Sequence, residues 1–464
     1  MVGITRTGTY FPRRRLDRAL IAKAWGGRVP AGARTVAGLD EDALTMATDA
    51  VLACLGDEDA ATFDALYFAS TSSPYLEKQV ASVIATAADL RRDVAVADFA
   101  GSVRAGLAAL RAALDGVRAG SLGSALVAAA DARLAEPDSE LEPLLGDGAA
   151  AVAVGGEGVV AELVSAASVA EEFTYLWRTD EQRTLRLSET RFGTAYGYVR
   201  DVAEALGAAL RKAELPPARV ARLVLGAPEP RAAAEAAKRA GFDPARVEAS
   251  LLSEAGLLGT PEPLALLVRS LETAAPGDFL AVAAYGEGAD ALVLRATERL
   301  PAARPRPLAE RLARGLALPS YERYLRARGV LPAEPMGEPV TAMLEWKELK
   351  QDVRLYGSRC QACGLVQFPQ ARVCLGCQAR DRMQDHKLAR RGTVFTFTID
   401  NLAPVPEHPM PMAVIDLERG GRLYLQVTDA AEGEVKVGAP VELTFRRLHE
   451  AAGNRNYFWK ARPA

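Results

Sequence analysis

The sequence is poor in histidine, in cysteine and in long apolar runs, and each shortage excludes a class of protein. No stretch reaches the roughly 18 consecutive apolar residues that a membrane-spanning helix needs. Five cysteines in 464 residues are too few for a disulfide scaffold. The three histidines, His386, His408 and His449, all lie beyond residue 385. The long first part of the chain therefore has no imidazole for acid–base catalysis or metal binding.

Neither sign of charge is in clear excess. The 56 basic and 59 acidic residues leave a formal net charge of −3, which gives no overall attraction to nucleic acid or to an anionic membrane. The first twenty residues lack the apolar segment and cleavage site of a signal peptide. With 49% hydrophobic and 25% charged residues, the composition is that of a globular protein. We expect a cytoplasmic protein with no membrane and no nucleic acid as partner.

The chain is too long for one ordinary domain, and its composition changes along its length. Residues 1–300 are rich in Ala, Leu, Val and Gly, whereas residues 301–345 begin with a Pro/Arg segment and contain the pattern of a charged helix. Beyond them the sequence first becomes rich in cysteine and then alternates between apolar and polar residues. We predict a large domain at 1–300, a helical connector at 301–345, and small domains at 346–384 and 385–464. The charged helix, residues 307–330, is either a hinge or docking clamp or, more commonly for such a pattern, a solvated surface helix.

The large domain contains a weak internal repeat of helix and strand patterns. In the first half a helical pattern precedes an apolar strand, and a second such pair and a further strand follow; the second half has the same order. The corresponding segments are 40–56, 63–71, 105–120, 124–132 and 149–156 in one half, and 200–215, 218–228, 261–278, 279–288 and 291–297 in the other. This order predicts an α/β sheet built twice and covered by helices. One long doubly wound domain without duplication is the alternative.

Four of the five cysteines lie within eighteen residues. Cys360 and Cys363 form one CxxC pair, Cys374 and Cys377 form another, and ten residues separate the pairs. Two such pairs place four thiolates around Zn²⁺, and a segment this small has too little apolar core to fold without the metal. We predict a rubredoxin-type zinc ribbon whose closed site is structural, with unliganded thiols or redox pairs as the alternative.

The residues after the ribbon alternate between apolar and polar, with glycine-containing turns. This pattern predicts a small antiparallel barrel of the OB type. Some OB barrels bind single-stranded nucleic acid through stacking aromatics, and Phe395, Phe397 and Tyr424 are candidates here. The segment has no basic excess for a backbone groove, so we expect these aromatics to belong to the core.

Several segments of the first 300 residues resemble the 3-hydroxy-3-methylglutaryl-CoA synthase branch of the thiolase superfamily. They are GITRTGTYFPRRRLDR, SSPYLEK, ADFAGSVRAGLAAL, GDGAAAVAVG and PGDFLAVAAYGEGADAL. The C-terminal module is similar to the zinc-ribbon and OB-fold domain that accompanies thiolases in acyl-CoA complexes. The resemblance implies a duplicated five-layer thiolase fold, dimerisation through that domain, and a CoA thioester as ligand.

The family's chemistry uses a Cys nucleophile, a Glu base, and a His with a nearby Asn. Matching the segments places Val103 at the Cys, Thr71 or by a shifted register Ser72 at the Glu, Gly226 at the His, and Leu257 at the Asn. Pro228 of the His-x-Pro stretch is retained, as is the glycine before the Asn position, here Gly256. At all four expected catalytic positions the residue differs from that of the family. This chain is therefore not expected to form an acyl-enzyme in the usual way.

Cys54 is the only cysteine of the large domain. It lies in a helical pattern, where the resemblance implies a helix remote from the acyl site. We interpret it as a small apolar residue on a packed helix.

Two functions remain open. In the first, the chain is a partner subunit that pairs with itself or with a catalytic thiolase-like chain, while its zinc-ribbon/OB module binds the CoA arm. In the second, it is a carbon–carbon lyase that cleaves a β-hydroxyacyl-CoA by retro-aldol chemistry without a Cys. The candidates for that chemistry are Tyr75, Asp98, Ser102 and Tyr285, although the two tyrosines are equally core-like, Asp98 fits a turn cap, and Ser102 fits a helix N-cap better than a catalytic group. An active synthase with a rewired nucleophile is a third, less favoured reading.

Overall fold

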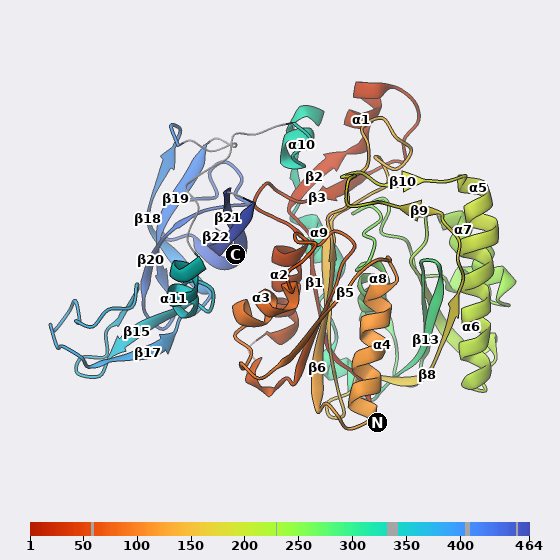
Figure 1. Ribbon diagram of the computed structural model, residues 1–464, viewed down its shortest axis with the longest axis horizontal. Helices are drawn as coiled ribbons and strands as arrows, with labels where there is room; N and C mark the ends of the chain where they lie inside the picture. The colour runs from red at the N-terminus through yellow and green to blue at the C-terminus, as the bar shows by residue number, and fades with distance from the viewer. Residues whose placement is uncertain (57–59, 229, 332–341, 404–408, 452) are drawn as a thin grey trace. The chain divides into compact units, whose positions relative to one another are not determined.

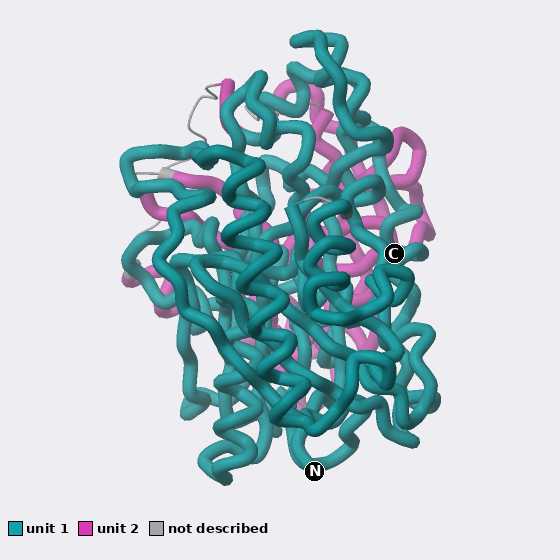
Figure 2. Tube along the Cα trace, turned by 90° about the vertical axis from the view of Figure 1, so that its right-hand side faces the viewer, with its two compact units in different colours: residues 1–328 teal, residues 329–464 magenta. Residues whose placement is uncertain are grey.

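The computed structural model describes residues 1–56, 60–228, 230–331, 342–403, 409–451 and 453–464. The chain forms two compact units, Met1–Arg328 and Gly329–Ala464 (Figure 2). Every strand pairing of the described residues stays within one of these units, so each unit has its own sheets.

A nine-stranded sheet is the frame of the first unit. Its strands lie in the order β11-β12-β13-β8-β1-β7-β6-β4-β5. Several strands are runs of Ala and Val that are buried along nearly their whole length, as expected where helices cover both faces of a sheet. The strands are β1 (Gly3–Tyr10), β4 (Ala65–Ala69), β5 (Ala95–Phe99), β6 (Ser124–Asp131), β7 (Gly148–Gly155), β8 (Ala161–Ala170), β11 (Val220–Leu225), β12 (Phe279–Tyr285) and β13 (Gly288–Ala296).

The sheet consists of two similar halves, which confirms the predicted duplication. From the centre outward, β1, β7, β6 and β4 make one half, and β8, β13, β12 and β11 make the other. In both halves the last two of these strands are parallel and the other pairings are antiparallel. Strand β5 has only a reduced counterpart, a single parallel bridge between Leu223 and Val247. The copies therefore differ at their outer edges.

Helices cover the two halves in three layers, giving five layers in all (Figure 1). Helix α2 packs on β1 and β7, α4 and α8 lie between the two halves, and α6 packs on β13 and β8. Their apolar residues recur at helical spacing and are buried; in α4 these include Leu107, Leu110, Leu114 and Val117. The helices of this unit are α1 (Arg18–Trp25), α2 (Ala43–Leu55), α3 (Val80–Ala87), α4 (Ala105–Arg118), α5 (Thr190–Phe192), α6 (Arg200–Lys212), α7 (Pro230–Arg239), α8 (Glu262–Thr273), α9 (Leu308–Ala313) and α10 (Tyr321–Ala327).

The residues from 301 to 328, assigned from the sequence to a connector, belong to the first unit. Tyr321 and Tyr324 are buried, and the guanidinium of Arg328 pairs with the buried carboxylate of Asp147 at 3.1 Å. The cause is packing: α10 buries its aromatic side against Leu16 and Val36 instead of lying free in solvent. Residues 332–341 of the predicted connector lie outside the described residues.

Short strands complete the first unit. They form a three-stranded sheet in the order β14-β2-β3 and a two-stranded sheet of β9 and β10. Their bounds are β2 (Arg14–Asp17), β3 (Ala33–Val36), β9 (Leu176–Trp177), β10 (Arg186–Leu187) and β14 (Leu316–Ala317).

The second unit has two parts after helix α11 (Ala342–Asp352). A three-stranded sheet, β16-β15-β17, carries the four clustered cysteines, and a five-stranded sheet, β20-β19-β18-β21-β22, follows it. A bridge between Val427 and Ala461 brings the end of β20 to β22, so the five strands curl into a small barrel, as predicted. The strands are β15 (Tyr356–Cys360), β16 (Val366–Gln367), β17 (Met383–Lys387), β18 (Arg391–Asp400), β19 (Met410–Leu417), β20 (Arg422–Gln426), β21 (Pro440–Ala451) and β22 (Asn454–Pro463).

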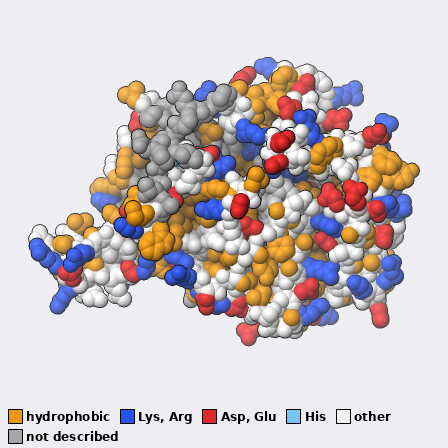
Figure 3. Space-filling model, in the orientation of Figure 1, with side chains coloured by type: hydrophobic (Ala, Val, Ile, Leu, Met, Phe, Trp, Pro, Cys, Tyr) orange, Lys and Arg blue, Asp and Glu red, His pale blue; other side chains and the backbone are white. Residues whose placement is uncertain are grey.

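The expectation that three barrel aromatics belong to the core is wrong. Phe395 is 50%, Phe397 37% and Tyr424 62% exposed. Aliphatic residues such as Ile415 and Leu425 fill the inner face of their sheet instead, which leaves the aromatic rings outside. The guanidinium of Arg422 covers the Phe395 ring at 3.7 Å. Figure 3 shows both basic and acidic side chains on the face that it draws.

None of the described helices has the length and apolarity needed to cross a membrane.

Candidate functional site

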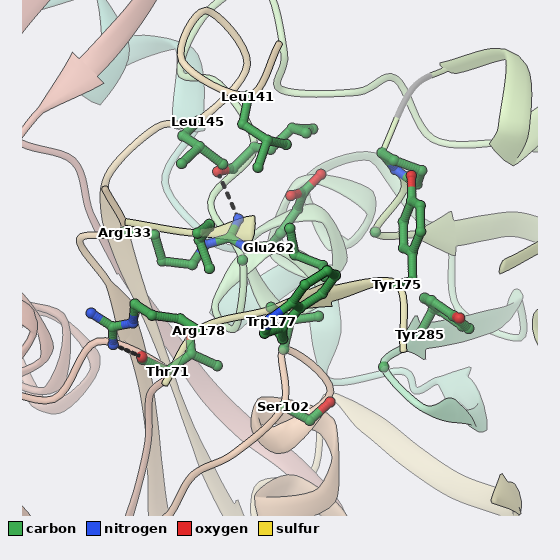
Figure 4. A pocket seen from close by; sticks show the side chains of 18 of the residues that line it. Thr71, Ser102, Arg133, Leu141, Leu145, Tyr175, Trp177, Arg178, Glu262 and Tyr285 are labelled. Atoms are coloured by element: carbon green, nitrogen blue, oxygen red, sulfur yellow. Dashed lines mark hydrogen bonds between the residues drawn. The ribbon is translucent and has the colours of Figure 1, made fainter. Parts of the chain in front are cut away.

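A pocket of about 620 Å³ opens in the first unit where parallel strands of both halves end. Residues just beyond the carboxyl ends of β4, β6, β11 and β12 line it, which is the edge at which α/β sheets place their ligands. Figure 4 shows side chains from these widely separated segments surrounding one space.

Asp131, at the end of β6, anchors residues that line the pocket. Its carboxylate is fully buried and accepts hydrogen bonds from Thr71, from Ser70 and Ser72, and from Thr260. The Thr71 hydroxyl donates to it at 2.9 Å and the Thr260 hydroxyl at 2.6 Å. This network ties the ends of β4 and β6 to the segment before α8 and thereby fixes the shape of the pocket.

A buried carboxyl group and a buried guanidinium lie beside each other in the pocket wall. Glu262, the first residue of α8, is 5% exposed, and Arg133, two residues after β6, is 6% exposed. Burial raises the pKa of Glu262 to about 7, although the charge of Arg133 and a hydrogen bond from the Leu258 N–H (3.1 Å) act in the opposite direction. Burial also lowers the pKa of Arg133. One guanidinium nitrogen of Arg133 donates to the carbonyl of Leu257, and its Nε is buried without a hydrogen-bond partner.

Two tyrosine hydroxyls face the same pocket without a hydrogen-bond partner. Tyr198 lies in the π-helical segment Gly193–Val199 before α6 and is 1% exposed, and Tyr285 ends β12. Their rings meet edge to face at 5.7 Å. Burial raises the pKa of each hydroxyl, and the carboxylate of Glu262 adds to the effect on Tyr198. Both groups therefore stay protonated and can donate to an acceptor in the pocket.

The remaining wall is largely aliphatic. A separate cluster of leucines around β9 and β10 forms one side of the pocket, close to Tyr175 and Trp177. The members that line the pocket are Leu141, Leu145, Leu176, Leu185 and Leu187. Such a wall fits an apolar chain.

The four clustered cysteines of the second unit form a possible metal site. Their sulfur atoms all lie within 4.8 Å of one another, with Cys360 to Cys377 at 3.7 Å and Cys363 to Cys374 at 3.5 Å. A tetrahedral ion with bonds of about 2.3 Å to sulfur separates its ligands by about 3.8 Å, so the spacing suits such an ion. Backbone N–H groups of Cys377 and Gly376 lower the pKa of the Cys374 thiol, which favours the thiolate that a metal needs.

The two units are similar to different known proteins. Residues 385–446 match the family described as the C-terminal OB-fold domain of ChsH2. A DUF35 domain-containing scaffold protein of Methanocaldococcus jannaschii is 33% identical over 123 residues, which cover 25% of this chain and 87% of that protein. A hydroxymethylglutaryl-CoA synthase of Methanopyrus kandleri is 28% identical over 340 residues, covering 70% of this chain and 97% of the relative.

The solved structures agree on the fold. The crystal structure of an HMG-CoA synthase complexed with CoA superposes with a TM-score of 0.66 over 73% of this chain and 95% of that one, at 19% identity. The chain carries a DUF35 domain. Its first unit is similar in sequence to hydroxymethylglutaryl-CoA synthases and has the fold of the solved HMG-CoA synthase.

The structure of the synthase-like part brings together the four positions that the resemblance assigns to catalytic residues. Thr71, Val103, Gly226 and Leu257 all line the one pocket, although 186 residues separate the first from the last in the numbering. The Thr71 side chain is engaged with Asp131, and its carbonyl accepts from Arg178 at 2.7 Å (Figure 4). None of the four side chains present is a nucleophilic thiol, a carboxylate or an imidazole.

The proposed alternative catalytic residues separate into two groups. Tyr75, Ser102 and Tyr285 line the pocket of the synthase-like part. Asp98 does not: its carboxylate accepts hydrogen bonds from the backbone of Val80 and Ala81, at the first turn of α3. Asp98 thus caps a helix, and its position at the end of an apolar strand does not make it part of the site.

The interpretation of Ser102 as a helix N-cap is wrong. Helix α4 begins at Ala105 with Arg104 as its N-cap, and the Ser102 hydroxyl makes no capping bond. Its Oγ is buried without a partner at the pocket, where Gly286 lets the chain approach so closely that an added Cβ would lie 2.0 Å away. The loop after β5 takes one further turn before α4 starts, which moves Ser102 off the helix end.

Cys54 lies away from the pocket, on α2, as expected for a packing residue. It is 4% exposed, and burial raises the pKa of its thiol to about 12. Two histidines are described: His449 contacts Asn456 at 3.0 Å, and burial lowers the pKa of His386. His408 lies outside the described residues.

Sequence reasoning missed Glu262, Arg133 and Tyr198 in the synthase-like part. Glu262 stands in the apolar run PEPLALLV, and Arg133 lies two residues after the apolar strand β6. A charged residue at such a place is a signal that sequence alone offers. Tyr198 carries no comparable signal, because a tyrosine in a helical stretch is ordinary.

Proposed function

We propose that this chain is an acyl-CoA-binding component of a thiolase-type complex that forms or cleaves carbon–carbon bonds. The observation that carries the proposal is a well-formed pocket at the catalytic edge of the fold in which the expected Cys, Glu, His and Asn positions hold Val103, Thr71, Gly226 and Leu257. A fold that keeps the pocket without that set is suited to binding, with the usual machinery supplied by a partner thiolase-like chain.

Two observations support a CoA thioester as the ligand. One similar structure contains CoA, and the chain covers 95% of that protein. The pocket itself combines the leucines around β9 and β10 with a few buried polar groups, among them Arg133 and Tyr198. This lining suits a thioester whose acyl group is apolar and of medium length.

The cysteine cluster is proposed to hold Zn²⁺ as a structural ion. All four ligands are cysteines, a set typical of closed zinc sites, and Cys360, Cys363, Cys374 and Cys377 stand at spacings suited to tetrahedral geometry. The ion would cross-link a part whose sheet contains a strand of only two residues, Val366–Gln367. The reducing cytoplasm would keep these thiols available.

The partner is proposed to be a second copy of this chain, a catalytic thiolase-like chain, or both. A relative of the DUF35 domain is named a scaffold protein, which supports a role in assembly. Native mass spectrometry of the tagged protein isolated from its own cells reads partner mass and zinc content together. A co-purifying thiolase-like chain with its own Cys and His supports the proposal.

Binding is tested on the purified chain with octanoyl-CoA by isothermal titration calorimetry. A Leu187→Asp variant, which places a charge in the aliphatic wall, should weaken binding by tenfold or more, since about 1.4 kcal/mol corresponds to tenfold. Leu331→Asp is the matched control, because Leu331 is 38% exposed and lies outside the pocket lining, the cysteine cluster and the barrel. No saturable binding to any acyl-CoA would contradict the proposal.

A retro-aldol lyase is the second candidate, favoured by the partnerless hydroxyls of Ser102, Tyr198 and Tyr285 at the pocket. Such a lyase should release an aldehyde or ketone from a β-hydroxyacyl-CoA, and Cys54→Ala should leave the rate unchanged. Product analysis by mass spectrometry decides between the two functions, because a binding component alone releases no carbonyl product.

A further inference from the structure

Among the residues that the structure describes, Glu262 is the one carboxyl group that both lines the pocket and is almost fully buried. Glu140 and Glu287, the other described carboxylates of the lining, are part of the exposed or half-buried surface. The Glu262 side chain reaches the pocket from the first turn of α8 and is held by the backbone N–H of Leu258. Figure 4 shows it between Arg133 and Tyr175.

Glu262 lies next to one of the positions where the family resemblance places a catalytic residue. Gly226 stands where the family resemblance places the histidine. An ideal Cβ on Gly226 would lie 4.0 Å from Cγ of Glu262 and 3.4 Å from Cγ of Pro263. The carboxyl side chain therefore lies beside the space that the imidazole would need. The family's base position is filled by Thr71, whose hydroxyl is already bonded to Asp131.

The charged and titratable groups around Glu262 come from several elements. Arg133 faces it from the end of β6 and favours the carboxylate, while Tyr198 faces it from the segment before α6 and stays protonated. Asp131 and Asp147 act on Arg133. Arg133 keeps a buried Nε without a partner, and Tyr198 keeps a buried hydroxyl without one. These donors are available to an oxygen atom that gains negative charge next to Glu262.

We propose that Glu262 is a catalytic base of this chain, which removes a proton from the carbon next to the thioester carbonyl of a bound acyl-CoA. The inference rests on the proposed acyl-CoA ligand and goes beyond it, because it assigns a reaction step to this chain without the family's Cys, His or Glu positions. Arg133 and Tyr198 hold the thioester oxygen.

The step balances without a further reactant. The C–H bond breaks and its electron pair forms the C=C bond of an enolate, while the carbonyl π-electrons move to the thioester oxygen. The Glu262 carboxylate becomes a carboxylic acid. Return of a proton from that acid restores the thioester, so the step by itself is an exchange of hydrogen with water. The raised pKa of Glu262, about 7, matches a base that works near neutral pH.

The test follows deuterium incorporation at C2 of octanoyl-CoA in deuterated buffer by mass spectrometry, using the full-length chain. The wild-type chain should exchange C2 hydrogen faster than buffer, with a rate that rises with pH through about 7 and then levels off. Glu262→Gln should lower the rate by about 10²-fold or more. Glu262→Asp should restore part of it, which a merely structural role would not produce. Glu254→Gln is the matched control, since Glu254 lies eight residues earlier, outside the pocket lining, paired with Arg269.

Binding is measured on the same samples by calorimetry, which separates the two proposals. Binding with no exchange above buffer overturns the assignment of Glu262 and leaves the acyl-CoA proposal standing. Exchange that is unchanged in Glu262→Gln overturns it as well. No binding of octanoyl-CoA or shorter acyl-CoA overturns both. The pH profile of the wild-type chain keeps the test decisive even where a variant folds poorly: a flat profile between pH 5.5 and about 8.5 counts against Glu262.

Discussion

Burial changes the acid strength of single residues in this protein, and Glu262 is the clearest case. The pKa of its carboxyl group is raised from the ordinary value of 4.5 to about 7 because the fold removes the group from water. The unfolded chain loses this proton near pH 4.5, whereas the folded chain keeps it until about pH 7. The contribution of Glu262 to the free energy of unfolding is therefore largest below about pH 4.5, and it is lost as the pH rises to about 7.

Replacing Glu262 by Gln should remove that pH dependence. The shift corresponds to about 3 kcal/mol at most, so relative to the wild type the variant should be more stable at pH 8 than at pH 5 by up to that amount. Calorimetric unfolding of both proteins at the two pH values measures the difference. A stability difference that is the same at pH 5 and pH 8 would contradict the raised pKa.

Cys54 offers a second test at the residue scale. Because its thiol is buried and its pKa is about 12, almost no thiolate exists at pH 8. Iodoacetamide should therefore leave Cys54 unlabelled in the native protein and label it after denaturation. Peptide mass spectrometry reads the label. Rapid labelling of the native protein would show that α2 opens or that Cys54 is exposed.

At the scale of elements, the contact between β1 and α2 depends on a glycine. An ideal Cβ on Gly8 would lie 2.3 Å from the carbonyl oxygen of Ala50 and 2.4 Å from the nitrogen of Cys54. Both neighbours are helix backbone and cannot rotate away. The approach of the helix to the sheet is therefore closer than any side chain at this position allows.

Gly8→Ala should destabilise the first unit by about 1–3 kcal/mol, the usual range for overpacking. Gly155→Ala is the matched control, since it also lies in a strand but its Cβ would meet nothing closer than 3.4 Å. Thermal unfolding of the two variants gives the comparison. Equal stabilities would mean that α2 shifts without loss.

The metal ligands tie three short strands together and give a test of the second unit. Cys360→Ser should lower the bound zinc to well below one per chain and loosen the β15–β17 sheet, because the remaining core is small. The unfolding transition of the first unit should stay unchanged. Zinc analysis and calorimetry measure both effects; collapse of the whole chain would contradict the separation into two units.

At the scale of the whole molecule, two units with separate cores are joined in one chain. The pocket of the first unit is proposed to take the acyl group. A hypothesis from the sequence is that the second unit binds the CoA arm. In that case Cys360→Ser should weaken binding of octanoyl-CoA and of free CoA alike, by about tenfold.

Leu187→Asp should act differently, because it alters only the aliphatic wall of the pocket. It should weaken octanoyl-CoA and leave free CoA unaffected. Calorimetric titration of the two ligands into the two variants distinguishes the contributions. An unchanged affinity for CoA in Cys360→Ser would show that the second unit takes no part in binding.

Much of this organisation is readable from the sequence. The repeated order of helices and strands predicted the duplicated fold because hydrophobic period follows secondary structure. The two CxxC pairs predicted the cysteine cluster because four local ligands need no distant contact. The barrel follows from the alternation after residue 385.

Other features depend on contacts between distant segments, and only the tertiary structure decided them. Glu262 meets Arg133, Tyr198 and Gly226 only in the folded chain, because these residues lie far from it in sequence. Asp98 and Ser102 look alike as polar residues near an apolar strand, yet one caps α3 and the other faces the pocket. Period and spacing are local properties, whereas burial and the meeting of side chains depend on how the whole chain packs.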